Sequence, residues 1–541
     1  MKKYFFMLAF ICANSLVFAQ KFQMIYLKDK ANTNFSTNKP LEFLTQKAID
    51  RRQKQNIKIG YRDLPVNPNY INEIRKLEPN IWYASRWFNA VLIQTDDATL
   101  AKINQLSFVQ KTERLSSQSL KIEGFEKQIL LNKNTNFQRF EEENYGSSFA
   151  QISMLGIDKM HNKGYRGEGI TIAVIDNGFT NADINPSLKQ LKILGTYDFT
   201  TRKNNVFNNS VTHGSNVLNI LAAYKSGEMI GGAFAANYFL FKTEIDNAEN
   251  KAEEAFWLAA VERADSLGVD IISTSLGYSD FDDVSMNYKT SDLTGKIALI
   301  SRAATMCANV GMIVVKSAGN EGNSAWKKIT FPADADSILV VGSVDSNGRR
   351  ALTSSLGPTA DGRRKPDVMA LGQGTVYCTP SGFVSSGNGT SYATPLITGL
   401  VAGVWQAFPN LSNMQIMDYI RRSSNRYFNS NDSIGYGVPN FEKINNLVTS
   451  TEKELGSQTI KIYPNPTKNG QFQIDFKPEY VGKSFVIKIY DSSGREWFSK
   501  NLHLDKSTQS IDAEKILPSR GWYLLRISGE KGNFTQSLIY E

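Results

Sequence analysis

Residues 147–448 alternate between short apolar runs and longer amphipathic runs, and this alternation restricts the fold more than any other feature of the 541-residue chain. The run 170–175 is continuously apolar, as in a strand buried on both faces, whereas 252–267 has the apolar spacing of a helix. Strands that alternate with helices predict an α/β fold, in which a parallel sheet carries helices on both faces. We predict further strands at 238–242, 269–274, 312–316 and 338–344, and further helices at 214–224, 297–309 and 412–422.

Different patterns flank this region on both sides. Residues 20–118 mix strand and helix patterns, with Asp96 as a candidate N-cap, and predict a small α/β domain. Residues 119–146 are rich in Asn, Gln, Lys and Glu and predict an exposed linker that is open to proteolysis. From 455 to 541 the apolar period changes to two, which predicts a small antiparallel β-sandwich. In the first domain we predict strands at 22–27, 89–94 and 108–113 and a helix at 41–55.

The N-terminal sequence predicts export. Two lysines precede the apolar run 4–18, and Ala19 supplies the small residue that signal peptidase requires. This pattern is typical of a cleaved signal peptide covering residues 1–19, and the run is too short for a membrane span. No second apolar run of about 18 residues follows, so we expect no transmembrane segment in the mature chain.

The net charge of +9 and the pI near 9.1 come without a dense block of Lys and Arg interleaved with aromatics. We therefore predict a diffuse solvated charge and no nucleic-acid partner. Arg51 and Arg52 have the form of a processing site, but we favour a solvated helix face. Cys307 and Cys378 would form one disulfide in an oxidising compartment, although we favour two separate thiols, in a buried helix and in a strand.

Four polar residues of the alternating region stand at strand ends or helix starts. Asp176 and Asn320 follow apolar strands, whereas His213 and Ser391 begin helical patterns. Ligands of open α/β sheets bind outside the carboxyl ends of the strands, so we expect the four side chains at one rim. Each also has an ordinary alternative, because these residue types cap helices, fill turns or lie exposed on surfaces.

Ser391 follows a small, flexible run that contains Gly387 and Gly389. At a helix N-terminus it would stand beside unpaired N–H groups and the positive end of the helix dipole. Such a place suits a nucleophile whose reaction develops negative charge on a nearby oxygen. The order Asp, His, Ser along the chain is that of subtilisin and differs from the orders in chymotrypsin and the α/β-hydrolases.

The segments around these residues resemble the signature blocks of the subtilisin-like serine proteases. Residues 231–242 are similar to the family's Gly/Ala-rich approach to a central strand, and Ser275, Leu276 and Gly277 are similar to its substrate-binding strand. The resemblance covers residues 147–448, and five blocks in the same order are a specific signal.

The resemblance implies a subtilisin-like fold and a secreted serine endopeptidase that acts on polypeptides. Ser391 would be the nucleophile, with His213 as general base and then acid, and with Asp176 holding the imidazole. The Ser391 N–H and the Asn320 amide would donate to the oxyanion, while the strand 275–277 would pair with an extended substrate. No cofactor is expected; calcium is common in the family, but the sequence assigns no ligands to it.

The sequence departs from the family pattern at four positions. Ser215 and Asn216 stand where the family usually has Thr and a second His, Tyr392 replaces the usual Met, and Asn177 replaces Ser or Thr. None of these changes removes a catalytic group. A non-catalytic subtilase-fold binding protein at the cell surface therefore remains an alternative.

The flanking domains extend the resemblance. Residues 20–118 look like a subtilase propeptide, so the chain's own propeptide is an expected partner, with a processing site in 119–146. Residues 455–541, which carry the sequence Pro464-Asn465-Pro466 near their start, look like a type IX secretion sorting domain. That domain implies the secretion machinery as a partner and a secreted or outer-surface location. The alternatives are an accessory domain at the N-terminus and an adhesive or stabilising β-domain at the C-terminus.

Overall fold

A computed structural model of the chain describes residues 20–116, 143–208, 210–456, 460–491, 495–529 and 532–541. The chain divides into two compact units, residues 1–444 and 445–541, and each is described by itself. The predicted signal peptide lies outside the described residues, as does the predicted linker up to residue 142. Within the described part of the chain, no helix is both long and apolar enough to cross a membrane.

A seven-stranded sheet with the order β13-β12-β11-β10-β5-β9-β6 lies at the centre of the first unit. Every neighbouring pair in it is parallel, which confirms the predicted parallel sheet. The strands are β5 Thr171–Asp176, β6 Lys192–Asp198, β9 Asn237–Lys242, β10 Ile271–Thr274, β11 Ile313–Ser317, β12 Leu339–Val344 and β13 Val368–Leu371.

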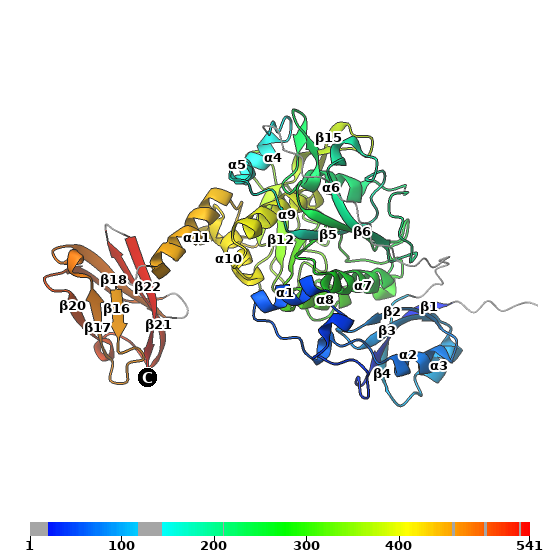
Figure 1. Cartoon of the computed structure of the whole chain (residues 1–541), viewed down its shortest axis with the longest axis horizontal. Helices are drawn as coiled ribbons and strands as arrows, with labels where there is room; N and C mark the ends of the chain where they lie inside the picture. The colour runs from blue at the N-terminus through cyan, green and yellow to red at the C-terminus, as the bar shows by residue number, and fades with distance from the viewer. Residues whose placement is uncertain (1–19, 117–142, 209, 457–459, 492–494, 530–531) are drawn as a thin grey trace, which may run out of the picture. The chain divides into compact units, whose positions relative to one another are not determined.

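Helices cover both faces of this sheet, as the alternation predicted. Figure 1 shows α6 and α9 on one side of the strands and α7 and α8 on the other. α7 ends where Gly268 takes the left-handed conformation, with φ of 78°. The larger helices are α6 His213–Ala222, α7 Ala252–Leu267, α8 Leu299–Asn309, α9 Thr390–Ala407 and α10 Asn413–Ser423. The smaller elements are α4 Phe149–Met154, α5 Ile157–Asn162, β7 Tyr224–Lys225, β8 Met229–Ile230, β14 Gln373–Cys378 and β15 Val384–Asn388.

The N-terminal domain is a four-stranded antiparallel sheet of order β2-β3-β1-β4 with three helices. The Asp96 carboxylate accepts the Thr99 N–H at 2.8 Å, which confirms the predicted N-cap. β2 and α2 were not predicted from the sequence. The elements are β1 Lys21–Leu27, α1 Gln46–Lys54, α2 Pro68–Arg75, β2 Asn80–Ser85, β3 Ala90–Thr95, α3 Asp97–Ile103 and β4 Val109–Arg114.

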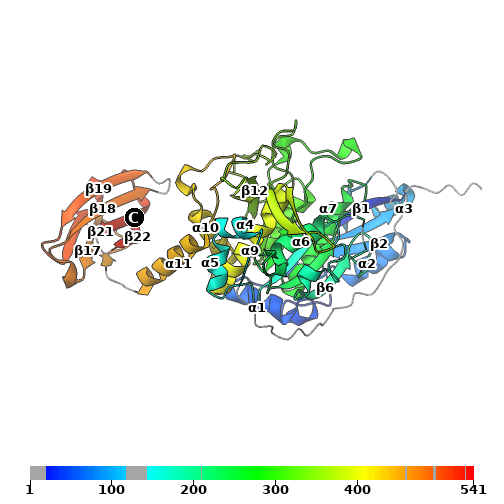
Figure 2. The same ribbon diagram turned by 90° about the horizontal axis from the view of Figure 1, so that it is seen from above.

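This domain contacts the rest of the unit at two separate places, which Figures 1 and 2 show as its sheet and its helix α1. The first contact is apolar: Phe22 and Trp82 pack on Phe256 of α7, each with ring centroids 5.5 Å away. Together with Trp87 they join the core that includes α7 and α8. Burial of large aromatic surfaces supplies most of the favourable free energy in such contacts.

The second contact is charged and corrects the prediction for Arg51 and Arg52. Both side chains are buried and both bind the carboxylate of Asp265 in α7; the Arg52 Nη2 to Asp265 Oδ2 distance is 2.8 Å. Arg86 binds the same carboxylate at 2.5 Å. Burial alone would raise the pKa of Asp265, but the three guanidinium groups hold that pKa at about 2. The prediction of a solvated helix face was wrong, because Asp265, the acid that binds both arginines, is more than 200 residues away in the sequence.

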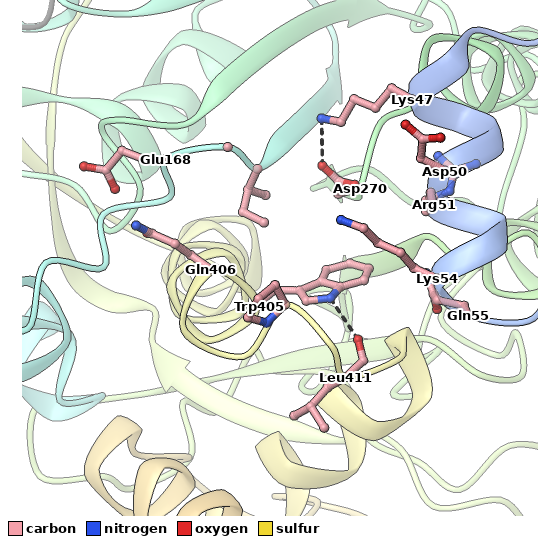
Figure 3. Close-up of a pocket in the computed structure, with 13 residues that line it drawn as sticks. Lys47, Asp50, Arg51, Lys54, Gln55, Glu168, Asp270, Trp405, Gln406 and Leu411 are labelled. Atoms are coloured by element: carbon pink, nitrogen blue, oxygen red, sulfur yellow. Dashed lines mark hydrogen bonds and ion pairs between the residues drawn. The ribbon is translucent and has the colours of Figure 1, made fainter.

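Side chains at helix α1 also donate hydrogen bonds to backbone carbonyl groups at or just after the C-termini of α7 and α8. The Arg51 guanidinium donates to the Val269 carbonyl and, at 3.1 Å, to the Val310 carbonyl. Gln55 donates to the Gly311 carbonyl at 2.9 Å. Helix C-termini leave carbonyl groups unpaired and carry partial negative charge, so cationic donors suit them. Figure 3 shows α1 across a cavity of about 310 Å³, where Lys47 pairs with Asp270 at 3.0 Å.

Cys307 and Cys378 are both buried free thiols, so the favoured interpretation of two separate thiols is confirmed. The short described end of the predicted linker belongs to the first unit: Glu143 pairs with Arg166, and the Asn144 carbonyl accepts the Gly227 N–H at 2.7 Å.

The second unit contains two antiparallel sheets, of orders β16-β17-β20 and β19-β18-β21-β22. Alternate residues such as Phe472, Ile474 and Ile487 form its core, as the period of two predicted. Helix α11 (Phe441–Gly456) spans the boundary between the units. The strands are β16 Ile460–Tyr463, β17 Gln471–Phe476, β18 Ser484–Asp491, β19 Glu496–His503, β20 Thr508–Asp512, β21 Gly521–Gly529 and β22 Gly532–Tyr540.

The Arg51 contact predicts a measurable loss of local stability. Arg51→Met leaves part of a buried carboxylate unpaired, so we expect the free energy that holds α1 closed to fall by about 3 kcal/mol. Amide hydrogen exchange in α1 of the full chain should accelerate about 100-fold. Lys47→Met is the matched control on the same helix, because its ion pair is partly exposed and worth at most about 1 kcal/mol. Equal acceleration in both variants would contradict the buried contact.

Candidate active site

The predicted residues Asp176 and His213 meet at the carboxyl rim of the sheet. Asp176 ends β5, His213 begins α6, and His213 Nδ1 lies 2.8 Å from Asp176 Oδ1. Gly214 makes this approach feasible, because a Cβ there would lie 2.9 Å from the Asp176 Cβ and would collide with the Gly178 carbonyl. The packing of α6 on the end of β5 therefore fixes the imidazole against the carboxylate.

The environment of His213 sets its affinity for a proton. Burial alone would lower the pKa of the imidazole, but the charge of Asp176 and its hydrogen bond raise that pKa above the ordinary 6.5. The Asp176 side chain is 2% exposed, whereas the His213 side chain is 34% exposed. Nδ1 is held by the carboxylate, and Nε2 has no hydrogen bond from the described residues.

Ser391 is the second residue of α9, so its N–H is one of the first-turn groups that have no acceptor inside the helix. Its hydroxyl donates to the Ser275 carbonyl at 3.1 Å, and the Ser275 hydroxyl donates back to the Ser391 carbonyl at 3.1 Å. The rings of Tyr392 and His213 lie 6.1 Å apart, so the starts of α9 and α6 are neighbours. No hydrogen bond joins Ser391 to His213 among the described residues; such bonds often form only when substrate binds.

Asn320 contacts the first residue of α9, Thr390. Its side-chain oxygen accepts the Thr390 N–H at 2.9 Å and the Thr390 hydroxyl at 3.1 Å. The amide is thus held by its oxygen, and its nitrogen finds no acceptor within the described part of the chain. Gly319 donates its N–H to the same Thr390 hydroxyl at 3.2 Å, which ties this turn to the start of α9.

A cleft of about 490 Å³ joins Asp176 and His213 to the segment Ser275, Leu276 and Gly277. Its far wall is acidic, and sequence reasoning missed it. Glu244, Glu249 and Glu253 place one carboxylate oxygen each within 4.8 Å of one another, a spacing at which three carboxylates could hold a metal ion. Burial raises the pKa of Glu244 to about 8 and that of Glu249 to about 7, so protons compete for the same oxygens. Glu244 follows β9 at the sheet rim, and the strand-end rule would have found it.

The four departures from the family pattern have local consequences. The Asn177 side chain accepts the Gly214 N–H at 3.3 Å, and the Ser215 hydroxyl donates to the Thr180 carbonyl at 2.8 Å. Tyr392 stacks on Tyr377, with ring centroids 5.4 Å apart. The Asn216 side-chain oxygen is buried without a partner among the described residues. None of these side chains separates Asp176 from His213.

Comparison with known families gives three matches. The subtilase family model matches residues 167–437. The model of the peptidase S8 propeptide domain of Bacteroidota matches 23–132, and that of the secretion system C-terminal sorting domain matches 461–541.

Individual relatives are similar over the same region. Subtilisin DY of Bacillus licheniformis is 31% identical over 288 residues, which cover 53% of this chain and 93% of the relative. Subtilisin E of Bacillus subtilis strain 168 is 28% identical over 318 residues, 58% of this chain and 76% of the relative. Among solved structures, MycP1 from Mycobacterium smegmatis matches 60% of this chain and 92% of its own, with 20% identity and a TM-score of 0.44.

The chain belongs to the subtilase family of serine peptidases, and the resemblance predicted from its sequence is confirmed. It is a serine endopeptidase that carries its own propeptide domain. Its C-terminal domain indicates export through the type IX secretion system.

Proposed function

We propose that the protein is made as a zymogen, is exported, and then hydrolyses polypeptides through Asp176, His213 and Ser391. The observation that carries the proposal is the 2.8 Å contact between His213 and Asp176, at the rim where α9 presents Ser391. His213 Nε2 takes the Ser391 proton as the hydroxyl attacks the scissile carbonyl carbon, and later gives it to the leaving amine. Asp176 holds the imidazole tautomer and stabilises its charged form.

The oxyanion of the tetrahedral intermediate receives two hydrogen bonds in this proposal. One donor is the Ser391 N–H at the start of α9, and the other is the Asn320 side-chain nitrogen, which the Thr390 contacts orient. Residues Ser275, Leu276 and Gly277 follow β10 and pair with the extended substrate, as an added strand does. A signal peptide at 1–19 and cleavage within 119–146 complete the proposed maturation.

The alternative is a non-catalytic subtilase-fold protein that binds partners at the cell surface. A fluorophosphonate probe separates the two, because it reacts only with an activated serine. The mature wild-type protein should be labelled at Ser391, and absence of labelling would favour the alternative.

Ser391→Ala should abolish peptide hydrolysis and leave the fold intact, since Ala is tolerated in a first helical turn. Wild-type protein should lose residues 20 to about 120–146, whereas the variant should keep them. Intact mass and N-terminal sequencing of both forms measure this. Removal of 455–541 is the internal control, because another enzyme should remove that domain whether or not Ser391 is present. Trimming of the variant at the same N-terminal site, with no other protease present, would contradict self-processing.

Asn320→Ala should lower kcat by about 10²–10³ with little change in KM, the loss known for an oxyanion donor of a subtilisin. The amide acts on the transition state in this proposal, so substrate binding should be spared. Asn320→Asp is the matched variant, because it keeps the side-chain oxygen that binds Thr390 and loses the donor. Unchanged kcat in Asn320→Ala would show that the residue only shapes the turn.

The pH dependence follows from the raised pKa of His213. Only the neutral imidazole accepts the serine proton, so kcat/KM should fall as pH falls through that pKa, with an inflection above 6.5. The chain has three histidines, so NMR titration of the Ser391→Ala protein is simple to assign. His161 is the contrast, because burial lowers its pKa to about 4. Asp176→Asn should move the His213 titration to lower pH, and an unmoved titration would contradict the pairing.

A further inference from the structure

Lys316 is a fully buried lysine in β11, beside the candidate active site. Its ammonium donates to the carbonyl of Ser317 and, at 3.0 Å, to the hydroxyl of Ser317. It forms no ion pair with any acid in the described part of the chain. Burial lowers the pKa of the amine to about 7, although the charges of Asp334 and Glu244 act against that shift.

Asp334 and Glu244, the two acids whose charges act on Lys316, do not form an ion pair with its ammonium. Asp334 is occupied by the Gly295 N–H at 2.7 Å and by the Ser301 hydroxyl. Glu244 accepts the Tyr278 hydroxyl at 2.5 Å. A buried ammonium without a carboxylate is costly, and such groups gather at functional sites. The buried Arg51 and Arg52 do have carboxylate partners, whereas the buried Lys30, far from the candidate site, donates to four backbone carbonyls.

The position of the ammonium relates it to bound substrate. A Cβ placed on Gly277 would lie 3.0 Å from Lys316 Nζ and would collide with the Thr330 hydroxyl. A Cβ on Gly319 would lie 2.9 Å from the same hydroxyl. The Thr330 hydroxyl therefore lies between Gly277 and Gly319, and the Lys316 ammonium lies beside Gly277.

These two glycines stand beside the reactive serine. Ser275, two residues before Gly277, exchanges hydrogen bonds with Ser391, while Gly319 is held to Thr390. A peptide whose carbonyl carbon lay at the Ser391 hydroxyl would place its preceding side chain near the segments 275–277 and 317–320. A side chain there would face the Lys316 ammonium and the Thr330 hydroxyl.

We propose that Lys316 selects substrates with a carboxylate side chain, Glu or Asp, immediately before the scissile bond. The substrate carboxylate would give the ammonium the partner that the chain itself lacks, and Thr330 would donate a second hydrogen bond. The flexible lysine side chain adjusts its reach to Glu or Asp. This inference rests on the proposed function, because it places the scissile carbonyl at Ser391.

The experiment compares peptides that differ only before the scissile bond, with Glu, Gln, Leu or Lys at that position. The matured full chain should cleave the Glu peptide about 10- to 100-fold faster in kcat/KM than the Gln peptide, because a charged hydrogen bond is lost with the amide. Lys316→Met, which fills the same volume, should bring the Glu-to-Gln ratio within about 3-fold of one. Lys365→Met is the matched control, since that lysine is also buried but is paired with Asp367 at 2.7 Å. Its Glu-to-Gln ratio should equal that of the wild type.

Each outcome decides the proposal. A wild-type enzyme that cleaves the Gln or Leu peptide as fast as the Glu peptide overturns the role of Lys316 and leaves the proposed function standing. A Glu preference that survives Lys316→Met overturns it as well. If Lys316→Met does not fold, the Glu-to-Gln ratio of the wild-type enzyme decides the proposal by itself. Failure to cleave any peptide, together with absence of fluorophosphonate labelling, would overturn the proposed function and this inference together.

Discussion

The close packing of α6 on the end of β5 is the contact on which the candidate site depends. β5 lies inside the sheet between β10 and β9 and is buried throughout, so the position of Asp176 is set by two ladders of backbone hydrogen bonds. The missing side chain of Gly214 then lets α6 bring His213 to within hydrogen-bond distance. α9 packs on the same sheet and holds Ser391 at the same rim. Reactive groups on rigid elements need little reorganisation during the reaction.

The propeptide domain is attached through two contacts of different physical character. The apolar contact of Phe22 and Trp82 with α7 is large but weakly directional. The cluster of Arg51, Arg52 and Arg86 on Asp265 is directional, because each guanidinium must meet one buried carboxylate. Desolvation offsets much of the Coulomb energy of such a cluster, so we interpret it as fixing the position of α1 more than adding net stability.

The charged groups in the interior of the first unit are of two kinds. Asp265 and Asp367 are buried and paired with cations, and the pKa of each lies below its ordinary value. Around the cleft, by contrast, the half-buried Glu244 and the buried Lys316 form no ion pair among the described residues, and desolvation shifts the pKa of each in the direction that favours the neutral form. Lys30 and Glu254 also lack an ion pair among the described residues, so it is their place beside the candidate nucleophile that makes Glu244 and Lys316 available to a ligand.

The sequence by itself determined the alternating fold, most strand and helix positions, and the residues that would meet at the rim. These follow from local rules, since apolar periodicity reports the buried face of an element and strand ends report the binding edge. The tertiary structure decided what the charged residues do. Arg51 and Arg52 looked like a solvated helix face because Asp265, their partner, is more than 200 residues away in the sequence. Lys316 was only the last residue of the predicted strand 312–316, and the structure shows that it is buried, close to Gly277, without an acid as a direct partner among the described residues. The partner of a charge is chosen by contacts distant in the chain, and no local period records them.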